Sequence, residues 1–227
     1  MKHSGQISES LRLGVILALS GGFMDAYSYI CREEVFANAQ TGNILLFGVH
    51  LSTGNITDAL RYLFPVLAFS FGIALANMIR HPLKNHEKIH WRQITVLAEA
   101  ILLALVAFIP QSHNLLANSL ISFVCGMQVE SFKKIRGNSI ATTMCIGNLR
   151  SATQLISDRL FIKDESLVKR SLLYYGVIAI FTLGAILGNL CVVWWQEKAI
   201  LGSSLLMFLA FFLMFIPPRD AAHEPRL

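Results

Sequence analysis

The chain has 227 residues, of which 54% are hydrophobic and only 15% are charged, with a formal net charge of +5. A soluble domain carries roughly 25% charged residues, so this composition and a mean hydropathy of +0.55 argue against a soluble protein and indicate a lipid bilayer. The positive charge does not indicate nucleic-acid binding. The Lys and Arg residues lie in short clusters between apolar runs, as they do in the loops of membrane proteins.

The cysteines predict no metal centre, no cofactor site and no disulfide framework. Cys31, Cys125, Cys145 and Cys191 form neither a CxxC pair nor a Cys/His cluster, which are the patterns that zinc sites and disulfide-rich domains require. The remaining information therefore lies in the apolar runs and in the polar residues that interrupt them.

Six apolar runs approach the roughly 20 residues that a helix needs to cross a bilayer. Two further runs are interrupted by polar residues, at 38–43 and at 141–148. In the first of these only residues 44–51 are cleanly apolar, which is about 12 Å of helix and too short to cross. The six predicted crossings are 13–30, 59–79, 94–109, 115–131, 171–195 and 199–216, and the two broken runs are 35–51 and 139–156.

The same pattern occurs twice along the chain. An apolar run ends in a carboxylate (Asp25, then Glu130), a polar break follows, and a Gly-Asn pair opens a second, shorter run. A small-xxx-small motif with a trailing Asn also recurs, and such motifs allow close helix packing with hydrogen bonds across the contact. We therefore expect one membrane domain, 1–227, with repeats at 13–110 and 115–216 and a polar tail at 217–227. The predicted packing residues are Gly72, Ala76, Asn77, Gly184, Gly188 and Asn189.

The distribution of positive charge decides between two topologies, because cytoplasmic loops are rich in Lys and Arg. If all eight runs cross, the 19 Lys and Arg residues divide almost evenly between the two sides. If the two broken runs enter and return on one side, all but Arg32, Arg61 and Lys198 lie inside. We therefore expect an all-α integral membrane protein of six transmembrane helices plus two broken re-entrant segments, built as two inverted repeats, with both termini cytoplasmic.

Two broken segments at symmetric places predict a central site. Non-helical backbone inside a membrane is tolerated only where it is buried in protein or lines a wet cavity, and the N–H groups of half-helices can bind polar or anionic ligands. Asp25 is the first candidate to carry a proton or coupling ion, followed by Glu130 and Glu99, for which interfacial solvation is the other explanation. The predicted substrate-binding residues are Asp25, Gln40, Thr41, Gly42, Asn43, Gln128, Glu130, Thr142, Thr143, Gly147 and Asn148.

Three motifs resemble those of the YoaK-like family (DUF1275) of bacterial multi-pass membrane proteins. They are Gly-Gly-Phe-x-Asp-Ala at 21–26, Thr-Gly-Asn at 41–43, and Ala-Thr-Thr-x-x-x-Gly-Asn at 141–148. The resemblance covers most of the chain and departs from the family pattern at Ile146, where Thr is expected. The resemblance implies an integral membrane protein and no known activity. We expect the protein to lie in the bacterial inner (cytoplasmic) membrane.

Three function classes follow from these observations. The leading hypothesis is a secondary transporter or channel-like carrier of a small polar solute, with an anion left open. The alternative is a non-transporting membrane scaffold or accessory subunit, in which the polar breaks serve packing. An enzyme is not expected, because the chain has no nucleophile–base pair, no HExxH and no Gly-rich phosphate loop. The expected partners are the lipid bilayer and a small polar solute, with a homodimer left open.

Overall fold

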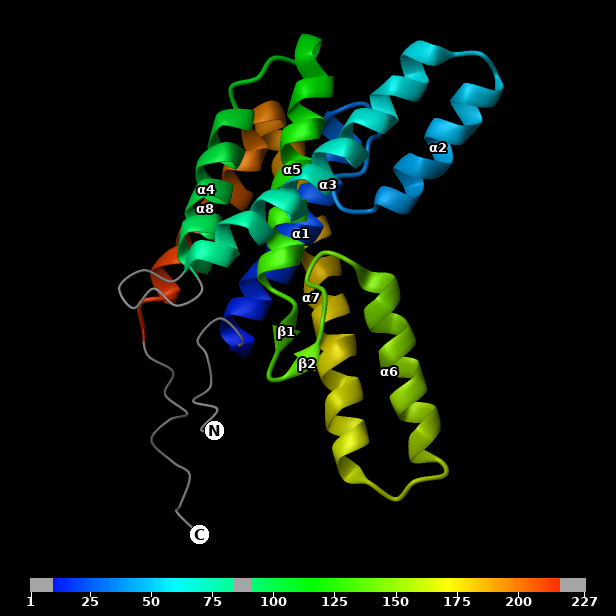
Figure 1. Ribbon diagram of the computed structural model, residues 1–227, viewed down its shortest axis with the longest axis vertical. Coiled ribbons are helices and arrows are strands. Elements are labelled where there is room, and N and C mark those ends of the chain that lie inside the picture. The colour runs from blue at the N-terminus through cyan, green and yellow to red at the C-terminus, as the bar shows by residue number, and fades with distance from the viewer. Residues whose placement is uncertain (1–9, 84–90, 217–227) are drawn as a thin grey trace.

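The computed structural model describes residues 10–83 and 91–216 as an elongated helical body (Figure 1). Two-residue strands β1 (Lys134–Ile135) and β2 (Asn138–Ser139) form a hairpin that the sequence did not predict. The predicted tail at 217–227 lies outside the described residues. The helices are α1 (Leu11–Cys31), α2 (Gln40–Ser52), α3 (Ile56–Leu83), α4 (Trp91–Val106), η2 (Gln111–His113), α5 (Asn114–Ser131), α6 (Cys145–Arg159), α7 (Glu165–Trp195), η3 (Gln196–Ile200) and α8 (Leu201–Leu213).

The helices that match the six predicted crossings have bounds close to the predicted ones, and the largest difference among them is at the start of α7. This helix begins at Glu165, well before the predicted start at residue 171. The Asp164 side chain accepts a hydrogen bond from the backbone N–H of Ser166 at 2.8 Å. An Asp N-cap followed by an acidic first turn favours a helix start, so local charge extends α7 into a stretch that hydropathy alone would leave as a loop.

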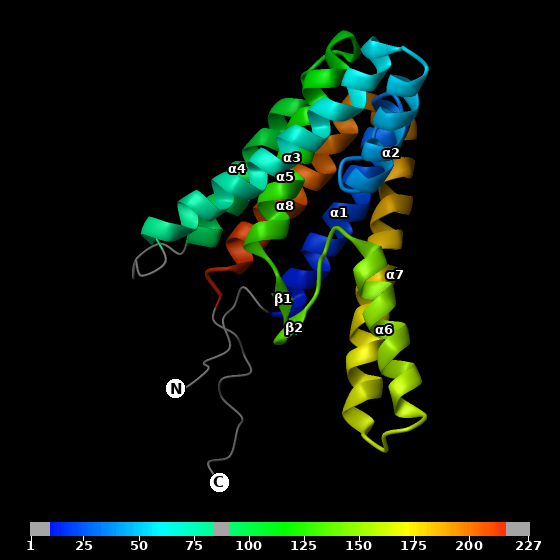
Figure 2. The ribbon, with the colours of Figure 1, turned by 45° about the vertical axis from the view of Figure 1, so that its right-hand side comes forward.

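The two broken runs form short helices that each lie along one long neighbour. α2 packs along α3 and α6 packs along α7. With 13 and 15 residues, each is about 20 Å long, against roughly 30 Å for the hydrocarbon core of a bilayer. Figures 1 and 2 show that the α2–α3 hairpin and the α6–α7 hairpin extend toward opposite ends of the molecule.

Helices from the two halves of the chain interlock. The most extensive packing joins α1 to α7 and α3 to α5, while α4 and α8 pack against each other. In addition, α4 packs on α5 and α8 packs on α1. These main contacts, together with α2–α3 and α6–α7, are unchanged when α1, α2, α3 and α4 are exchanged with α5, α6, α7 and α8. The halves therefore form one body rather than two adjacent bundles.

Glycines bring α1 and α7 into backbone contact. A Cβ atom built at Gly22 would overlap the carbonyl oxygen of Phe181, and one built at Gly184 would overlap the carbonyl oxygen of Leu19. A Cβ at Gly188 would lie 2.9 Å from the carbonyl oxygen of Phe23. Both helices therefore need glycine at these positions, because a side chain there would push α1 and α7 apart.

Glycines also bring α3 and α5 into backbone contact. A Cβ at Gly72 would overlap the carbonyl oxygen of Phe123, and one at Gly126 would overlap that of Phe69. The two crossings therefore have glycines on both helices, at positions that correspond between the halves of the chain.

The trailing asparagines of the two packing motifs lie away from these crossings. Gly72, Ala76, Gly184 and Gly188 are buried, whereas Asn77 and Asn189 are exposed. Residues four apart share a helix face, but the next residue is turned by about 100°. The hydrogen bonds that we expected these asparagines to form across the contact are therefore not favoured by the geometry.

The exterior is apolar, as expected for a protein in lipid. Within residues 10–83 and 91–216, three stretches are long and apolar enough to cross a membrane: Leu11–Cys31, Ile56–Leu83 and Glu165–Leu213. Polar side chains such as Ser20 and Ser203 lie buried and bond to each other. A large exposed apolar surface marks a membrane or protein contact. It includes Phe64, Leu67, Phe71, Met78, Ile186, Leu190, Val193, Leu205, Leu209 and Phe212.

Replacing Gly184 by Ala is expected to destabilise the fold, because the added methyl group would overlap the Leu19 carbonyl and push α1 from α7. Overpacking of this kind costs about 1–3 kcal/mol, so the melting temperature of the purified protein should fall by several degrees. The control is Gly176→Ala on the same helix, where nothing lies within 4 Å of the new Cβ. Equal losses in both variants would contradict the close crossing.

Candidate functional site

Asn43 closes the first break with its side-chain amide. Its Nδ2 group donates to the carbonyl oxygen of Phe36 at 2.8 Å, and its Oδ1 atom accepts from the backbone N–H of Phe36 at 3.1 Å. The Nδ2 group also donates to Oε1 of Gln40 at 2.9 Å. The buried amide therefore acts as a peptide partner for extended backbone that has left the helix.

Asn148 closes the second break in the same way. Its Nδ2 group donates to the carbonyl oxygen of Ala141 at 2.6 Å, and its Oδ1 atom accepts from the Ala141 N–H at 3.3 Å. In both breaks the asparagine bonds to the residue seven positions earlier. We expected Asn43 and Asn148 to bind substrate, but the structure commits both amides to the protein's own backbone.

The two glycines beside these asparagines lie in different surroundings. A Cβ at Gly42 would lie 2.8 Å from the Phe36 ring, whereas nothing lies within 4 Å of a Cβ at Gly147. Gly147 borders an open groove of about 630 Å³ along the outer face of α6. Of the other predicted residues in the first break, Thr41 is exposed and Gln40 donates to the Ala37 carbonyl at 2.8 Å.

Both breaks contact α1 at Gly21. The Asn38 side chain donates to the Gly21 carbonyl at 2.6 Å. From the other half of the chain, the carbonyl oxygen of Thr142 would lie 2.9 Å from a Cβ at Gly21, and Cγ2 of Thr143 would lie 3.2 Å away. We define the central polar cluster as Gly21, Asp25, Asn38, Gln128, Thr142 and Thr143.

Asp25, which lies on α1, anchors the first break through a hydrogen bond. Its Oδ1 atom accepts a hydrogen bond from the backbone N–H of Asn38 at 2.7 Å. The N-cap residue of α2, Ala39, makes no side-chain cap bond. Because the N-terminal end of a helix carries partial positive charge, the Asp25 carboxylate supplies negative charge where α2 begins. A solute anion would have to compete with this carboxylate.

Gln128, which lies on α5, anchors the second break through a hydrogen bond. Its Nε2 group donates to Oγ1 of Thr142 at 3.0 Å and to the carbonyl oxygen of Leu17 at 3.1 Å. Within the described residues, the buried Oε1 atom of Gln128 and the buried Oδ1 atom of Asn38 have no hydrogen-bond partner. An unpaired buried acceptor costs about 1–3 kcal/mol. The cluster therefore has acceptors available for a molecule that donates hydrogen bonds.

The two glutamates proposed from the sequence lie elsewhere. Glu130 pairs with Lys133 and lies 3.9 Å from Arg80, near the ends of α5 and α3. Glu99 on α4 is fully buried, and neither carboxylate oxygen has a partner in the described part of the chain. No group of three His, Cys, Asp or Glu side chains in residues 10–83 and 91–216 is placed to hold a metal ion.

Arg32 is a buried residue whose role the sequence did not reveal. Its guanidinium donates to Tyr27 Oη at 2.9 Å, to Asn114 Oδ1 at 2.9 Å, and to the carbonyl oxygens of Val106 at 3.3 Å and Ile109 at 2.8 Å. This cation joins the end of α1 to the α4–α5 connection. Two glutamates, Glu33 and Glu34, follow it in the sequence. Such a charged run is typical of a solvated loop, so only the fold reveals that Arg32 is buried.

Comparisons with known proteins support a membrane protein without assigning an activity. A family model described as "Protein of unknown function (DUF1275)" matches residues 13–213. The chain is 27% identical over 184 residues to the UPF0700 transmembrane protein YoaK of Bacillus subtilis (strain 168), covering 76% of this chain and 79% of that protein. No solved structure matches.

Asn148→Ala is expected to release the second break, because the backbone groups of Ala141 would lose both partners. Unpaired groups of this kind cost about 1–3 kcal/mol each. We expect a lower melting temperature and faster amide hydrogen exchange near residue 141. Asn77→Ala, which alters an exposed asparagine on α3, is the control and should leave both unchanged. Normal exchange protection near residue 141 in Asn148→Ala would refute the role of this amide.

Proposed function

We propose a function for this chain, which belongs to the family described as "Protein of unknown function (DUF1275)", on the basis of its central polar cluster. The protein is a secondary transporter or channel-like carrier of a small polar solute. The observation that carries this proposal is the meeting of two broken segments at Gly21, with buried acceptors on Asn38 and Gln128 that lack partners.

The proposed architecture has six crossings and two re-entrant segments in two inverted repeats. The exchange symmetry of the main helix packing supports it, because α1–α7, α2–α3 and α4–α5 have counterparts in α5–α3, α6–α7 and α8–α1. The placement of charge supports the proposed orientation. The start of α1, the end of α8, the β-hairpin and the α6–α7 tip lie toward one end in Figure 1, and the positive-inside rule assigns that end to the cytoplasm.

The unpaired groups favour a solute that donates hydrogen bonds. Asn38 and Gln128 each offer a carbonyl oxygen, and the Asp25 carboxylate lies beside Asn38. Such a set suits a hydroxyl, amine or cationic group better than an anion, which narrows the solute class left open by the sequence. Asp25 is the proposed carrier of a coupling proton or ion, since carboxylates within membrane segments are costly and usually functional.

The proposed transport motion uses the interlocked halves. In carriers built from inverted repeats, one repeat rocks against the other around a site near the bilayer midplane. Here the two main crossings are lined by glycines, so the helices meet through smooth backbone surfaces rather than interdigitated side chains. This geometry would let the two halves shift while the central polar cluster stays between them.

A membrane scaffold is the second candidate, and one observation favours it. Asn43 and Asn148 bond to their own backbone, and Gly42 packs on Phe36, so these motif residues serve the fold directly. In a scaffold, the breaks would be packing devices and the cluster would bind no solute. Solute binding therefore discriminates between the two candidates.

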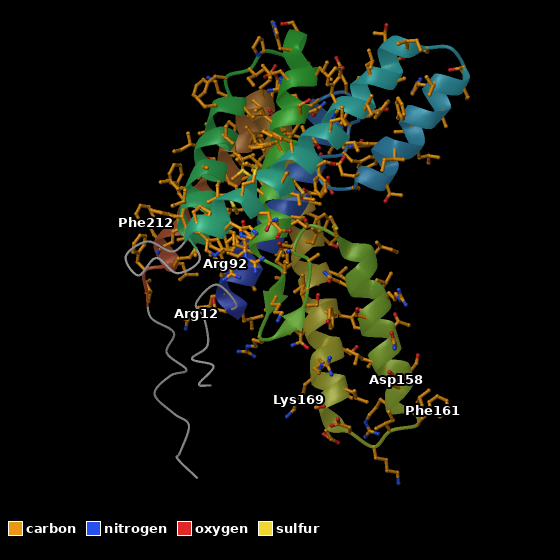
Figure 3. All side chains as sticks on the ribbon, in the orientation of Figure 1. Arg12, Arg92, Asp158, Phe161, Lys169 and Phe212 are labelled. Carbon is orange, nitrogen blue, oxygen red and sulfur yellow. The ribbon has the colours of Figure 1, made fainter. Side chains whose placement is uncertain are left out.

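At least one solute in a panel of amines, amino acids, polyols and organic anions is expected to raise the melting temperature of the purified protein. A ligand at about 100 times its Kd stabilises by about 2.7 kcal/mol. Asp25→Asn should remove most of this shift. Asp158→Asn is the matched control, because Figure 3 shows Asp158 near the tip of the α6–α7 hairpin.

Two results would contradict the transporter proposal. One is the absence of any shift across the panel with folded wild-type protein. The other is a shift that Asp25→Asn and Asp158→Asn retain equally, because binding would then lie outside the central polar cluster. Uptake of the stabilising solute into proteoliposomes, present in wild type and reduced in Asp25→Asn, would separate carriage from binding alone.

The proposed topology places Ser112 and Ser166 on opposite sides of the membrane. Both are exposed, and cysteines introduced there should react with a membrane-impermeant maleimide differently in intact cells. We expect Ser112→Cys to label from outside and Ser166→Cys to label only after permeabilisation. The half-buried Cys145 and Cys191 are replaced in this background. Labelling of both sites from the same side would exclude the six-crossing arrangement.

A further inference from the structure

A separate pocket lies where α3 and α5 end and α4 begins. Its volume is about 190 Å³, which at roughly 30 Å³ per water molecule corresponds to about six waters. None of its residues belongs to the central polar cluster. We define the cationic pocket by its lining residues, Arg80, Trp91, Arg92, Glu130, Phe132, Lys133 and Lys134.

Positive charge exceeds negative charge in this pocket. Arg80, Arg92, Lys133 and Lys134 are cationic, and Glu130 is the one carboxylate among the described residues that line the pocket. The Glu130 carboxylate accepts a hydrogen bond from Lys133 and lies 3.9 Å from Arg80. Even without Arg92, the three cations Arg80, Lys133 and Lys134 outnumber the one carboxylate among the described lining residues, so these residues attract an anion.

The Arg92 side chain is held in place at the pocket. Its Nε group donates to the carbonyl oxygen of Ser131 at 2.7 Å, and its guanidinium carbon lies 5.0 Å from the centre of the Trp91 ring. Trp91 itself is buried. A fixed, planar guanidinium suits the recognition of phosphate oxygens. The start of α4 at Trp91 adds the positive end of a helix dipole.

The pocket lies at the border of the apolar exterior. Met78, just before Arg80 on α3, is exposed, and so is Ile94, just after Arg92 on α4. Further along α4, Ile101 and Leu105 are exposed as well. A molecule with a negatively charged head and apolar tails would match both surfaces, whereas a free anion would use only the pocket.

The opposite end of the body has the reverse charge. A groove there is lined by Tyr29, Ile30, Glu33, Glu34 and Arg61, which include two carboxylates and one cation. The excess of positive charge at the end of α3 and α5 is therefore particular to that end and not a general feature of the helix ends. Anionic headgroups are known to bind basic pockets between helices at the membrane surface.

We propose that the cationic pocket binds a phosphate group, supplied by the headgroup of an anionic phospholipid. Arg80 and Lys134 bind the phosphate oxygens, and the lipid tails lie along the exposed apolar side chains of α3 and α4. The site does not depend on the transport proposal, because it shares no residue with the central polar cluster.

The test uses full-length protein stripped of lipid in detergent, with melting temperature and native mass spectrometry as readouts. Phosphatidylglycerol, phosphatidylcholine and inorganic phosphate are titrated separately. We expect phosphatidylglycerol to bind and to raise the melting temperature most. The double variant Arg80→Gln/Lys134→Gln should bind it about 30-fold more weakly, the loss expected for two cations at a membrane surface.

The matched control is Lys163→Gln/Lys169→Gln, which removes the same charge near the tip of the α6–α7 hairpin. Figure 3 places Lys169 there and Arg92 at the start of α4. This control should bind phosphatidylglycerol as wild type does. The single variant Lys134→Gln alters an exposed side chain and should show a smaller loss in the same direction, which guards against misfolding of the double variant.

Three outcomes would overturn the proposal. Equal losses in the two double variants would show attraction by overall charge rather than by the cationic pocket. Stabilisation by inorganic phosphate that phosphatidylglycerol fails to reproduce would assign the pocket to a soluble phosphate and exclude the lipid source. No response to either ligand in folded wild-type protein would exclude a phosphate site.

Discussion

Backbone N–H and C=O groups that leave a helix inside an apolar body must find partners within the protein. In this chain two asparagines meet that demand with one geometry, each bonding through its amide to both backbone groups of a residue seven positions earlier. The half-helices α2 and α6 can begin inside the body because of these bonds. The placement of the central polar cluster depends on where the two breaks end.

Close helix crossings bring the two breaks together. Gly22 and Gly184 set the separation of α1 from α7, and Gly72 and Gly126 set that of α3 from α5. Because each crossing joins a helix of one half to a helix of the other, the break before α6 reaches α1 at Gly21, where the break before α2 is also anchored. A polar cluster is thereby assembled from residues more than a hundred positions apart.

Much of the fold could be predicted because membrane segments obey local rules. Hydropathy and length located the long helices to within a few residues, and the positions of Gly42-Asn43 and Gly147-Asn148 located both breaks. The site was harder to predict from the same residues. Asn43 and Asn148 were expected to bind solute, yet their hydrogen bonds go to the chain itself, and a spacing of seven residues across a non-helical turn cannot be read from periodicity.

The sequence by itself determined that this is a helical membrane protein with two interrupted segments, because apolar content, charge placement and Gly-Asn pairs are local properties. Only the tertiary structure decided that Asn38 lies beside Asp25, that Gln128 bonds to Thr142, that Glu130 faces Lys133 and Arg80, and that Arg32 is buried. These outcomes depend on which helices pack together. Helix partners are set by the fit of side chains distant in the sequence, which no local pattern specifies.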